Sequence, residues 1–344
     1  MAPLESDSIS TLVRKVYVAC VAISFLFCSG CGAAYIFQAA SGQFSLLNNS
    51  IKIEKALKTD SLDDGIKLKL QLVSEIKKFG EERLGLRKTD SYEKVYLKSG
   101  RSPIYVLSAC PKDSLKRKTW WFPIVGNMPY LGFFDQKKAE KKKNKLKNED
   151  MDVIMRTAGA YSTLGWFDDP VTLNLLAGST VDLVETILHE MTHTTLYIKG
   201  NGEFNEGLAN LVGKIGAISF FRNKYGTAHP FTFEAENNLF DELLFSGYIN
   251  SLIDDLIEIY SSDLSYQHKI RQREEIFRAY HEKHSKSKGE YKTERFKYFG
   301  THDFNNAYIL SIALYRREFP KFYKMLEENN NSVRSLLKNL KRNK

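Results

Sequence analysis

Two histidines four residues apart, with a glutamate directly after the first, constrain this 344-residue chain more than any other feature. They lie in the segment Thr186–Tyr197, whose apolar residues recur with helical spacing. Four residues turn an α-helix by about 400°, so the imidazoles of His189 and His193 project from nearly one face, about 6 Å apart along the axis. That arrangement suits two ligands of one tetrahedral ion such as Zn²⁺. The sequence therefore predicts a metal-binding helix.

The glutamate of this motif, Glu190, is one step from His189 and therefore projects beside the ion rather than at it. A carboxylate in that place can accept a proton from a water held by the metal. The alternative is a surface histidine pair with a helix-favouring glutamate, since a chance match occurs on the order of once per hundred proteins. An apolar face at Ile187, Leu188 and Leu196 favours the metal site.

A catalytic zinc site needs a third protein ligand and an open fourth position. The segment Phe204–Asn210 opens a second helical run shortly after the first, so two antiparallel helices can face each other. Glu206 would then approach the ion from the opposite side, and Asn210, one turn on, could bond the second ring nitrogen of a histidine. Glu203, in a glycine-rich turn, is the competing ligand.

The cysteines are unevenly placed. Three lie within the first 31 residues and Cys110 is the fourth, which excludes an intramolecular disulfide framework for the folded body. A content of 43% hydrophobic residues supplies a core instead, and the net charge of +9 favours contact with anionic surfaces. Seven lysines lie in residues 135–150 without interleaved aromatics, so they predict a solvated helix face and no nucleic-acid partner.

The N-terminus has the architecture of a signal peptide. Arg14 and Lys15 precede the uncharged run Val16–Gly30, which as a helix spans only about 22 Å of a hydrocarbon core of about 30 Å. The tripeptide ending at Cys31 resembles a bacterial lipobox, in which the cysteine becomes the acylated first residue. We therefore predict residues 1–30 as a lipoprotein signal and Cys31 as the lipidation site, with an uncleaved anchor as the alternative. Both interpretations place an exported body at a membrane, facing the periplasm or the cell surface.

Residues 31–344 are predicted as one α+β domain with two lobes and the active-site helix at the cleft between them. A helical pattern over Ile66–Phe79 is expected to stop at Gly80, and the chain from Asp182 onward is predicted to be mainly helical. Short segments rich in β-branched and aromatic residues predict a small sheet in the first half. These segments are Ile104–Leu107, Thr119–Val125 and Asp152–Met155.

Six segments spread over nearly the whole mature chain carry a likeness to a known family. They are Ser29–Gln43, Trp121–Asp135, Ala160–Pro170, His189–Tyr197, Phe204–Glu206 and Asn305–Ala307. Together they resemble the bacterial putative aminopeptidase family of exported zinc metallopeptidases. The Asn-Glu-Gly-Leu-Ala run after His-Glu-x-x-His is also similar to the gluzincins, zinc peptidases whose third ligand is a glutamate. The resemblance implies a zincin-like fold, one zinc ion per chain on His189, His193 and Glu206, and Glu190 as catalyst.

The chain also departs from the family pattern. Cysteines are common in the family where this chain has Trp121 and Asn127, and a serine is common where it has Gly207. The resemblance therefore implies a disulfide in relatives that this chain lacks. The segment Gly-x-Met-Glu-Asn, whose glutamate holds the free amine in well-known glutamate-zincin aminopeptidases, does not occur here. Aminopeptidase specificity thus rests on the resemblance alone.

The function predicted from these features is zinc-dependent hydrolysis of a peptide bond by an exported, membrane-anchored enzyme, with Glu190 moving the proton. Ala160–Trp166 is either an edge strand to which a substrate adds or a set of core aromatics. Alternative functions are a membrane-attached scaffold with a structural zinc and a zinc hydrolase of non-peptide amides or esters. Residues that could stabilise the oxyanion are Tyr161, Tyr308, Tyr315 and His302.

Overall fold

The computed structural model describes most of the chain after its N-terminal segment. The described residues are 47–60, 62–97, 104–122, 126–133, 135–158, 168–301 and 303–342. Contacts divide the chain into two compact units, residues 1–48 and 49–344, and all elements named below belong to the second. The predicted signal segment, Cys31, the segment 160–166 and His302 lie outside the described residues. No described helix combines the length and the apolar character that a membrane crossing needs.

The first half of the described chain contains three small sheets, where the sequence predicts one small sheet. In the largest, the central strand β3 (Ile104–Pro111) pairs antiparallel with β6 (Leu131–Phe133) and β7 (Met151–Ala158). The expected strands over residues 104–107 and 152–155 are therefore confirmed. The second sheet has the order β1-β2-β8 and the third is an antiparallel pair of strands. Their strands are β1 (Ile51–Lys52), β2 (Lys94–Tyr96), β8 (Val171–Thr172), β4 (Trp120–Phe122) and β5 (Gly126–Met128).

The pair β4–β5 bears on the departure from the family pattern. Trp121 and Asn127, where the resemblance implies cysteines in relatives, are direct partners in its register. A disulfide at these positions would therefore join two adjacent strands. In this chain the two strands pair through their backbones, and the Trp121 side chain is exposed.

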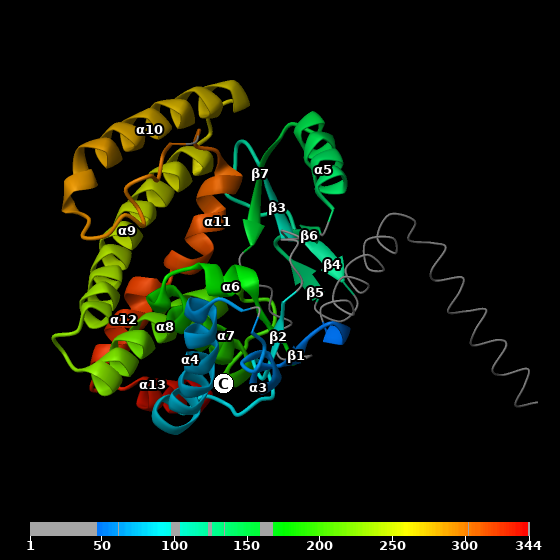
Figure 1. Cartoon of the computed structure of the whole chain (residues 1–344). Coiled ribbons are helices and arrows are strands. Elements are labelled where there is room, and N and C mark those ends of the chain that lie inside the picture. The colour runs from blue at the N-terminus through cyan, green and yellow to red at the C-terminus, as the bar shows by residue number, and fades with distance from the viewer. Residues whose placement is uncertain are drawn as a thin grey trace, which may run out of the picture. The chain divides into compact units, whose positions relative to one another are not determined.

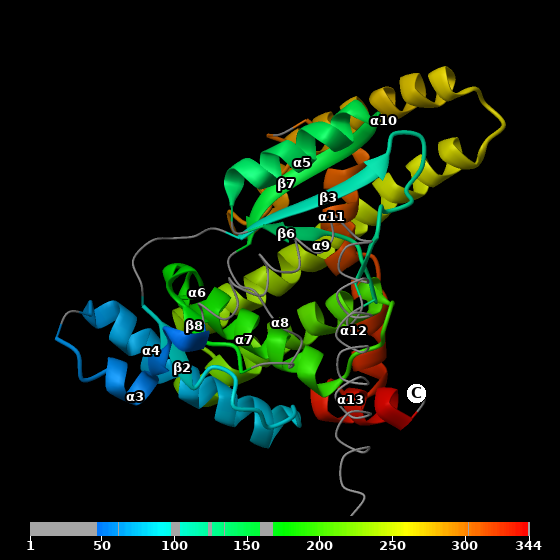
Figure 2. The same cartoon turned by 90° about the vertical axis from the view of Figure 1, so that its right-hand side faces the viewer.

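Two helices cover the sheet β6-β3-β7. Both α5 (Gln136–Asn148) and α11 (Asn306–Arg316) contact β3 and β7, and the sheet lies between them in Figures 1 and 2. The lysine-rich helix α5 buries Ala139 and Leu146 and leaves most of its lysines exposed, which confirms the predicted solvated face. On the other face, Cys110 packs against the first turns of α11.

The second half is helical, so the prediction of a mixed α+β chain with small sheets and a mainly helical C-terminal half is confirmed. The expected stop at Gly80 is wrong in detail. The α-helix ends at Phe79, but residues Gly80–Leu84 continue as a π-helical turn that ends at Gly85, whose φ is +75°.

The described helices besides α5 are α3 (Ile53–Ala56), α4 (Asp64–Phe79), α6 (Leu173–Ala177), α7 (Thr180–Thr195), α8 (Gly202–Tyr225), α9 (Pro230–Ser261), α10 (Tyr266–Ser287), α11, α12 (Phe319–Glu328) and α13 (Val333–Arg342), with a 3₁₀ turn over Lys288–Glu290.

Two hydrophobic clusters stabilise the helical part. The larger lies among α4, α7, α8, α12 and α13, with fully buried Leu70, Leu188 and Leu211. The smaller is mainly aromatic and joins α9, α10 and α11 through residues such as Phe245 and Phe299. Apolar burial drives the folding of both clusters. The larger one supports the helix that carries the histidine pair.

Candidate metal centre

The histidine motif lies on α7, and the local sequence explains why the helix begins where it does. The Ser179 hydroxyl accepts a hydrogen bond from the Asp182 backbone N–H at 3.0 Å, and the Asp182 carboxylate accepts one from the Ser179 N–H at 3.3 Å. This capping box satisfies two donors at the start of the helix. His189 and His193 then fall on the last turns of α7, as predicted.

The helix that carries Glu206, α8, is fixed at its start by two asparagines. Asn201 caps it by accepting from the Phe204 N–H at 3.1 Å. The buried Asn205 side chain bonds the backbone N–H and C=O of Ile198, each at 2.8 Å. These bonds tie the connection between α7 and α8 to the first turn of α8. Glu206, the next residue, is therefore held against α7.

Glycines on α8 allow the two helices to approach closely. A Cβ atom on Gly213 would lie 2.6 Å from the Glu185 carbonyl oxygen and 3.4 Å from the His189 Cβ. One on Gly216 would lie 2.6 Å from the Leu188 Cδ1. Gly213 follows Glu206 by seven residues, which is two helical turns, so both lie on the same face of α8. The close crossing therefore lies directly beside the histidines.

The crossing brings three ligand atoms together. The Nε2 atoms of His189 and His193 are 3.1 Å apart, and the Glu206 Oε2 lies 3.2 Å from the first and 3.6 Å from the second. Ligands of a tetrahedral ion with bonds of about 2.0–2.1 Å are separated by about 3.3 Å. His193 is buried and the other two side chains are partly buried. The three groups thus fit a single divalent ion.

The electrostatics of this triad also favour a cation. Burial alone would raise the pKa of Glu206, but hydrogen bonds from His189 and His193 and the charges of these rings outweigh it and lower that pKa. For His193, burial lowers the pKa, yet the hydrogen bond and charge of Glu206 outweigh burial and leave that pKa raised. A metal ion must displace a proton from such a histidine, so binding is expected to weaken in acid.

Glu190 lies next to the triad with an unused oxygen. Within the part of the chain that the structure describes, its buried Oε2 atom has no hydrogen-bond partner. Buried polar atoms without a partner are rare and costly, and a catalytic role is one explanation for such an atom. The carboxylate is thus free to accept a proton.

The charge of Glu190 acts on two tyrosines. The charge of Glu206, burial and the charge of Glu190 raise the pKa of Tyr315, whose ring lies 6.0 Å from the His189 ring, centroid to centroid. Burial and the charge of Glu190 raise the pKa of Tyr92, which adopts φ = +64°. Tyr315 is a sequence-predicted candidate, but Tyr92 is not, because no local motif links it to the histidines. Both phenols stay protonated at neutral pH and can donate hydrogen bonds.

The structure separates the two candidate third ligands. Glu203 accepts a hydrogen bond from Arg117 at 2.7 Å and has no place in the triad, whereas Glu206 lies within it. The expected role of Asn210 is wrong. Its amide donates to Glu242 at 3.1 Å and to the Tyr315 carbonyl at 3.4 Å, because its face of α8 is turned toward α9 and α11. The Nδ1 atom of His193 has no hydrogen-bond partner among the described residues.

Tyr308, another oxyanion candidate, lies in the aromatic cluster. Its ring stacks on Phe299 with centroids 5.6 Å apart. Tyr161 and His302 fall outside the described residues. Of the four candidates, Tyr315 is therefore the one that the described structure places beside the histidine motif.

Buried charges hold α7 and α8, the helices that carry the triad, to α9 and α11. The Lys214 ammonium on α8 lies 3.2 Å from Glu185 on α7 and 3.4 Å from Glu242 on α9, and Arg316 on α11 lies 2.8 Å from Glu242. Burial alone would raise the pKa of Glu242, but the charges of Arg316 and Lys214 outweigh it and lower that pKa. This buried charge network begins one turn before His189 and ends beside Tyr315.

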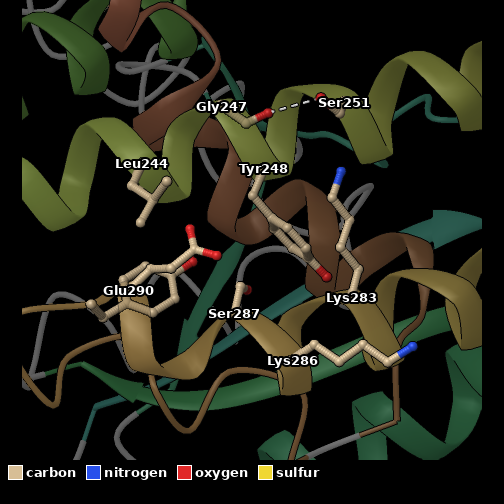
Figure 3. A pocket seen from close by; sticks show the side chains of 9 residues that line it. Leu244, Gly247, Tyr248, Ser251, Lys283, Lys286, Ser287 and Glu290 are labelled. Atoms are coloured by element: carbon tan, nitrogen blue, oxygen red, sulfur yellow. Dashed lines mark hydrogen bonds between the residues drawn. The ribbon is translucent and has the colours of Figure 1, made fainter.

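A separate groove lies between α9 and α10. Figure 3 shows Tyr248 reaching into it from α9 and Lys283 from α10, with Ser251 bonded to the Gly247 carbonyl. None of the sequence-predicted site residues lines it. The histidine motif, not this groove, is the candidate site.

Comparison with known proteins gives one match. Residues 34–343 match the family described as “Putative aminopeptidase”. No curated protein sequence and no solved structure matches the chain.

Proposed function

Since the chain belongs to the putative aminopeptidase family, we propose that it is a zinc-dependent peptidase of the gluzincin type. One zinc ion per chain would be held by His189, His193 and Glu206. The observation that carries the proposal is the convergence of these three ligand atoms, from two helices, beside the unpartnered carboxylate oxygen of Glu190. Two imidazoles and one carboxylate suit zinc and leave a coordination position open for catalysis.

A bound zinc ion supplies a Lewis acid that polarises the scissile carbonyl and makes water a better nucleophile. Glu190 accepts the proton of the attacking water and passes it to the leaving amine, which is the work of a general base and then of a general acid. Its position one residue after His189 keeps the carboxylate beside the ion and out of the ligand set. Its free Oε2 supports this role.

We assign stabilisation of the oxyanion to the Tyr315 hydroxyl. Its ring packs near His189, and the nearby negative charge of Glu206 together with burial keeps the phenol protonated. A protonated donor fixed beside the reacting carbonyl stabilises the charge that develops in the transition state.

We also propose a location for the enzyme from its sequence. Arg14 and Lys15, the apolar run Val16–Gly30 and Cys31 support export and a lipid anchor, so the peptide substrates would be those outside the cytoplasmic membrane of a bacterium. Mass spectrometry of the protein purified from membranes tests the lipid anchor, since an intact Met1 would contradict cleavage and acylation at Cys31.

Hydrolysis itself is tested with a random peptide library, with and without chelator, on wild-type protein and on Glu190→Gln. Glutamine keeps the shape of the side chain but cannot accept a proton, so we expect turnover to fall by at least about 100-fold while zinc stays bound. Glu203→Gln is the matched control and should keep activity, because Glu203 pairs with Arg117 and lies outside the triad. Undiminished turnover by zinc-loaded Glu190→Gln would rule out the general base, and cleavage that survives chelation would rule out metal catalysis.

A further inference from the structure

Alternate residues of β7 face α11. Asp152 accepts a hydrogen bond from the Asn306 N–H, where α11 begins, at 2.8 Å, and Ile154 packs against the apolar first turns of that helix. Arg156 is the next residue on this face. Its guanidinium carbon lies 6.0 Å from the ring centroid of Tyr315, near the end of α11. The sheet thus presents a cation to the helix end that adjoins the metal centre.

Arg156 differs from the other arginines that the structure describes as buried or partly buried. Each of the others pairs with a carboxylate, whereas Arg156 has neither an ion-pair nor a hydrogen-bond partner in the described structure. A partly desolvated guanidinium has five N–H donors that need acceptors. The pairs are Arg117–Glu203, Arg273–Asp152, Arg316–Glu242 and Arg317–Asp254.

Tyr315 connects Arg156 to the metal centre. Its ring lies 6.0 Å from the guanidinium carbon of Arg156 and 6.0 Å from the ring of His189. Arg156 and Arg117 also line the same small pocket between the sheet and α11. Because Glu203 neutralises Arg117, the pocket keeps the positive charge of Arg156.

From this placement we infer that Arg156 forms a subsite for a carboxylate of the substrate, next to the metal centre. The inference rests on the proposed function for the identity of the substrate as a peptide. A guanidinium binds a carboxylate through two parallel hydrogen bonds, which fixes both the position and the orientation of the bound group. The carboxylate is either the C-terminus of the peptide or the side chain of an aspartate or glutamate.

The carboxylates near Tyr315 are not available to bind a free α-amine, although the charge of Glu206 is the largest that acts on this phenol. An α-ammonium group would be repelled by Arg156, and the carboxylates described nearby already have other roles. Glu190 is the base and Glu206 the ligand, while Glu203 is paired with Arg117. The subsite therefore selects for negative charge on the substrate, a preference distinct from recognition of an N-terminus.

Three hexapeptide libraries test the subsite on the full zinc-loaded chain: one with free C-termini, one with C-terminal amides and one without Asp and Glu. For Arg156→Gln we expect the ratio of kcat/KM for peptides with the selected carboxylate to those without it to fall about 10- to 100-fold. Arg156→Lys should restore part of that ratio, and Arg271→Gln, an exposed site on α10, should leave it unchanged. A preference lost on amidation identifies the C-terminus, and one lost when Asp and Glu are absent identifies a side chain.

Binding separates failure of the subsite from failure of the proposed function. The three libraries are also bound to zinc-loaded Glu190→Gln, with and without Arg156→Gln. If the wild-type chain cleaves no peptide but Arg156→Gln still removes selective binding of carboxylates, the subsite stands and the peptidase proposal fails. If Arg156→Gln leaves the ratio unchanged, or weakens all peptides equally, the subsite is wrong whether or not cleavage occurs.

Discussion

The helix pairs α7–α8 and α9–α10 are held together by different means. The first pair crosses at Gly213, where helix backbones come into direct contact, and is joined by the buried ammonium of Lys214. The second pair is joined by large rings and by a hydrogen bond from the Tyr248 hydroxyl to the Tyr280 carbonyl at 2.7 Å. It leaves an open groove between its helices (Figure 3).

We relate this difference to the proposed function, in which α7 and α8 position metal ligands and α9 and α10 do not. Metal ligands must be held to within about 0.5 Å, which backbone contact and directional ion pairs achieve. Aromatic packing buries apolar area but tolerates small shifts of one helix along another. We therefore expect changes in the α7–α8 pair to affect metal affinity, and changes in the α9–α10 pair to affect stability alone.

The largest expected effect is that of Lys214→Met. Removing the ammonium leaves Glu185 and Glu242 buried with one partner fewer, which we expect to lower the free energy of unfolding by about 3–5 kcal/mol. Zinc affinity should fall as well, because Glu185 lies one turn before His189. Phe245→Ala in the aromatic cluster is expected to cost a similar 3–5 kcal/mol through the cavity it creates. Denaturant titration measures the free energy of unfolding, and competition with a zinc dye measures the zinc affinity. Equal zinc affinities for the two folded variants would contradict the claim that only the α7–α8 pair affects metal binding.

A smaller effect is expected where the helices touch. Gly213→Ala places a methyl group 2.6 Å from the Glu185 carbonyl, so the helices must separate, at a cost of about 1–3 kcal/mol and with weaker zinc binding. Gly247→Ala on α9 is the matched control. Nothing lies within 4 Å of its added methyl group, so it should stabilise the chain by about 0.5–1 kcal/mol through helix propensity. Thermal unfolding should show a lower melting temperature for Gly213→Ala and a higher one for Gly247→Ala. A Gly213→Ala variant as stable as wild type would contradict a direct backbone contact between α7 and α8.

How far the sequence alone could predict the site depends on the range of the contacts. The histidine pair and the start of the helix with Glu206 are local patterns, so periodicity and spacing indicate them. The role of Asn210 depends on α9 and α11, more than 30 residues further along the chain, and no spacing rule reports that contact. The same holds for Arg156 and Tyr92, which no local motif links to the histidines. Arg156 approaches Tyr315 through the packing of α11 on β7, and Tyr92 belongs to the larger hydrophobic cluster that includes residues of α7.

The smallest expected effect concerns a buried histidine in the aromatic cluster. Burial lowers the pKa of His284, and the charge of Lys288 lowers it further. In the unfolded chain this histidine titrates near pH 6.5, so from there down to the lower folded value the unfolded state binds more protons. The free energy of unfolding should therefore fall as the pH drops through that window. Urea titrations of metal-free protein between pH 7 and 5 should show a weaker pH dependence for His284→Leu, and an unchanged slope would contradict the shift.

The zinc content of Glu206→Ala and Glu203→Ala tests the central claim most directly. The two glutamates lie three residues apart at the start of α8, but one faces the histidines and the other faces Arg117. After dialysis we predict about one zinc ion per chain for wild type and Glu203→Ala and close to none for Glu206→Ala, since two histidines alone hold zinc too weakly. Circular dichroism confirms that both variants are folded. Zinc retained by Glu206→Ala and lost by Glu203→Ala would contradict the metal centre as described.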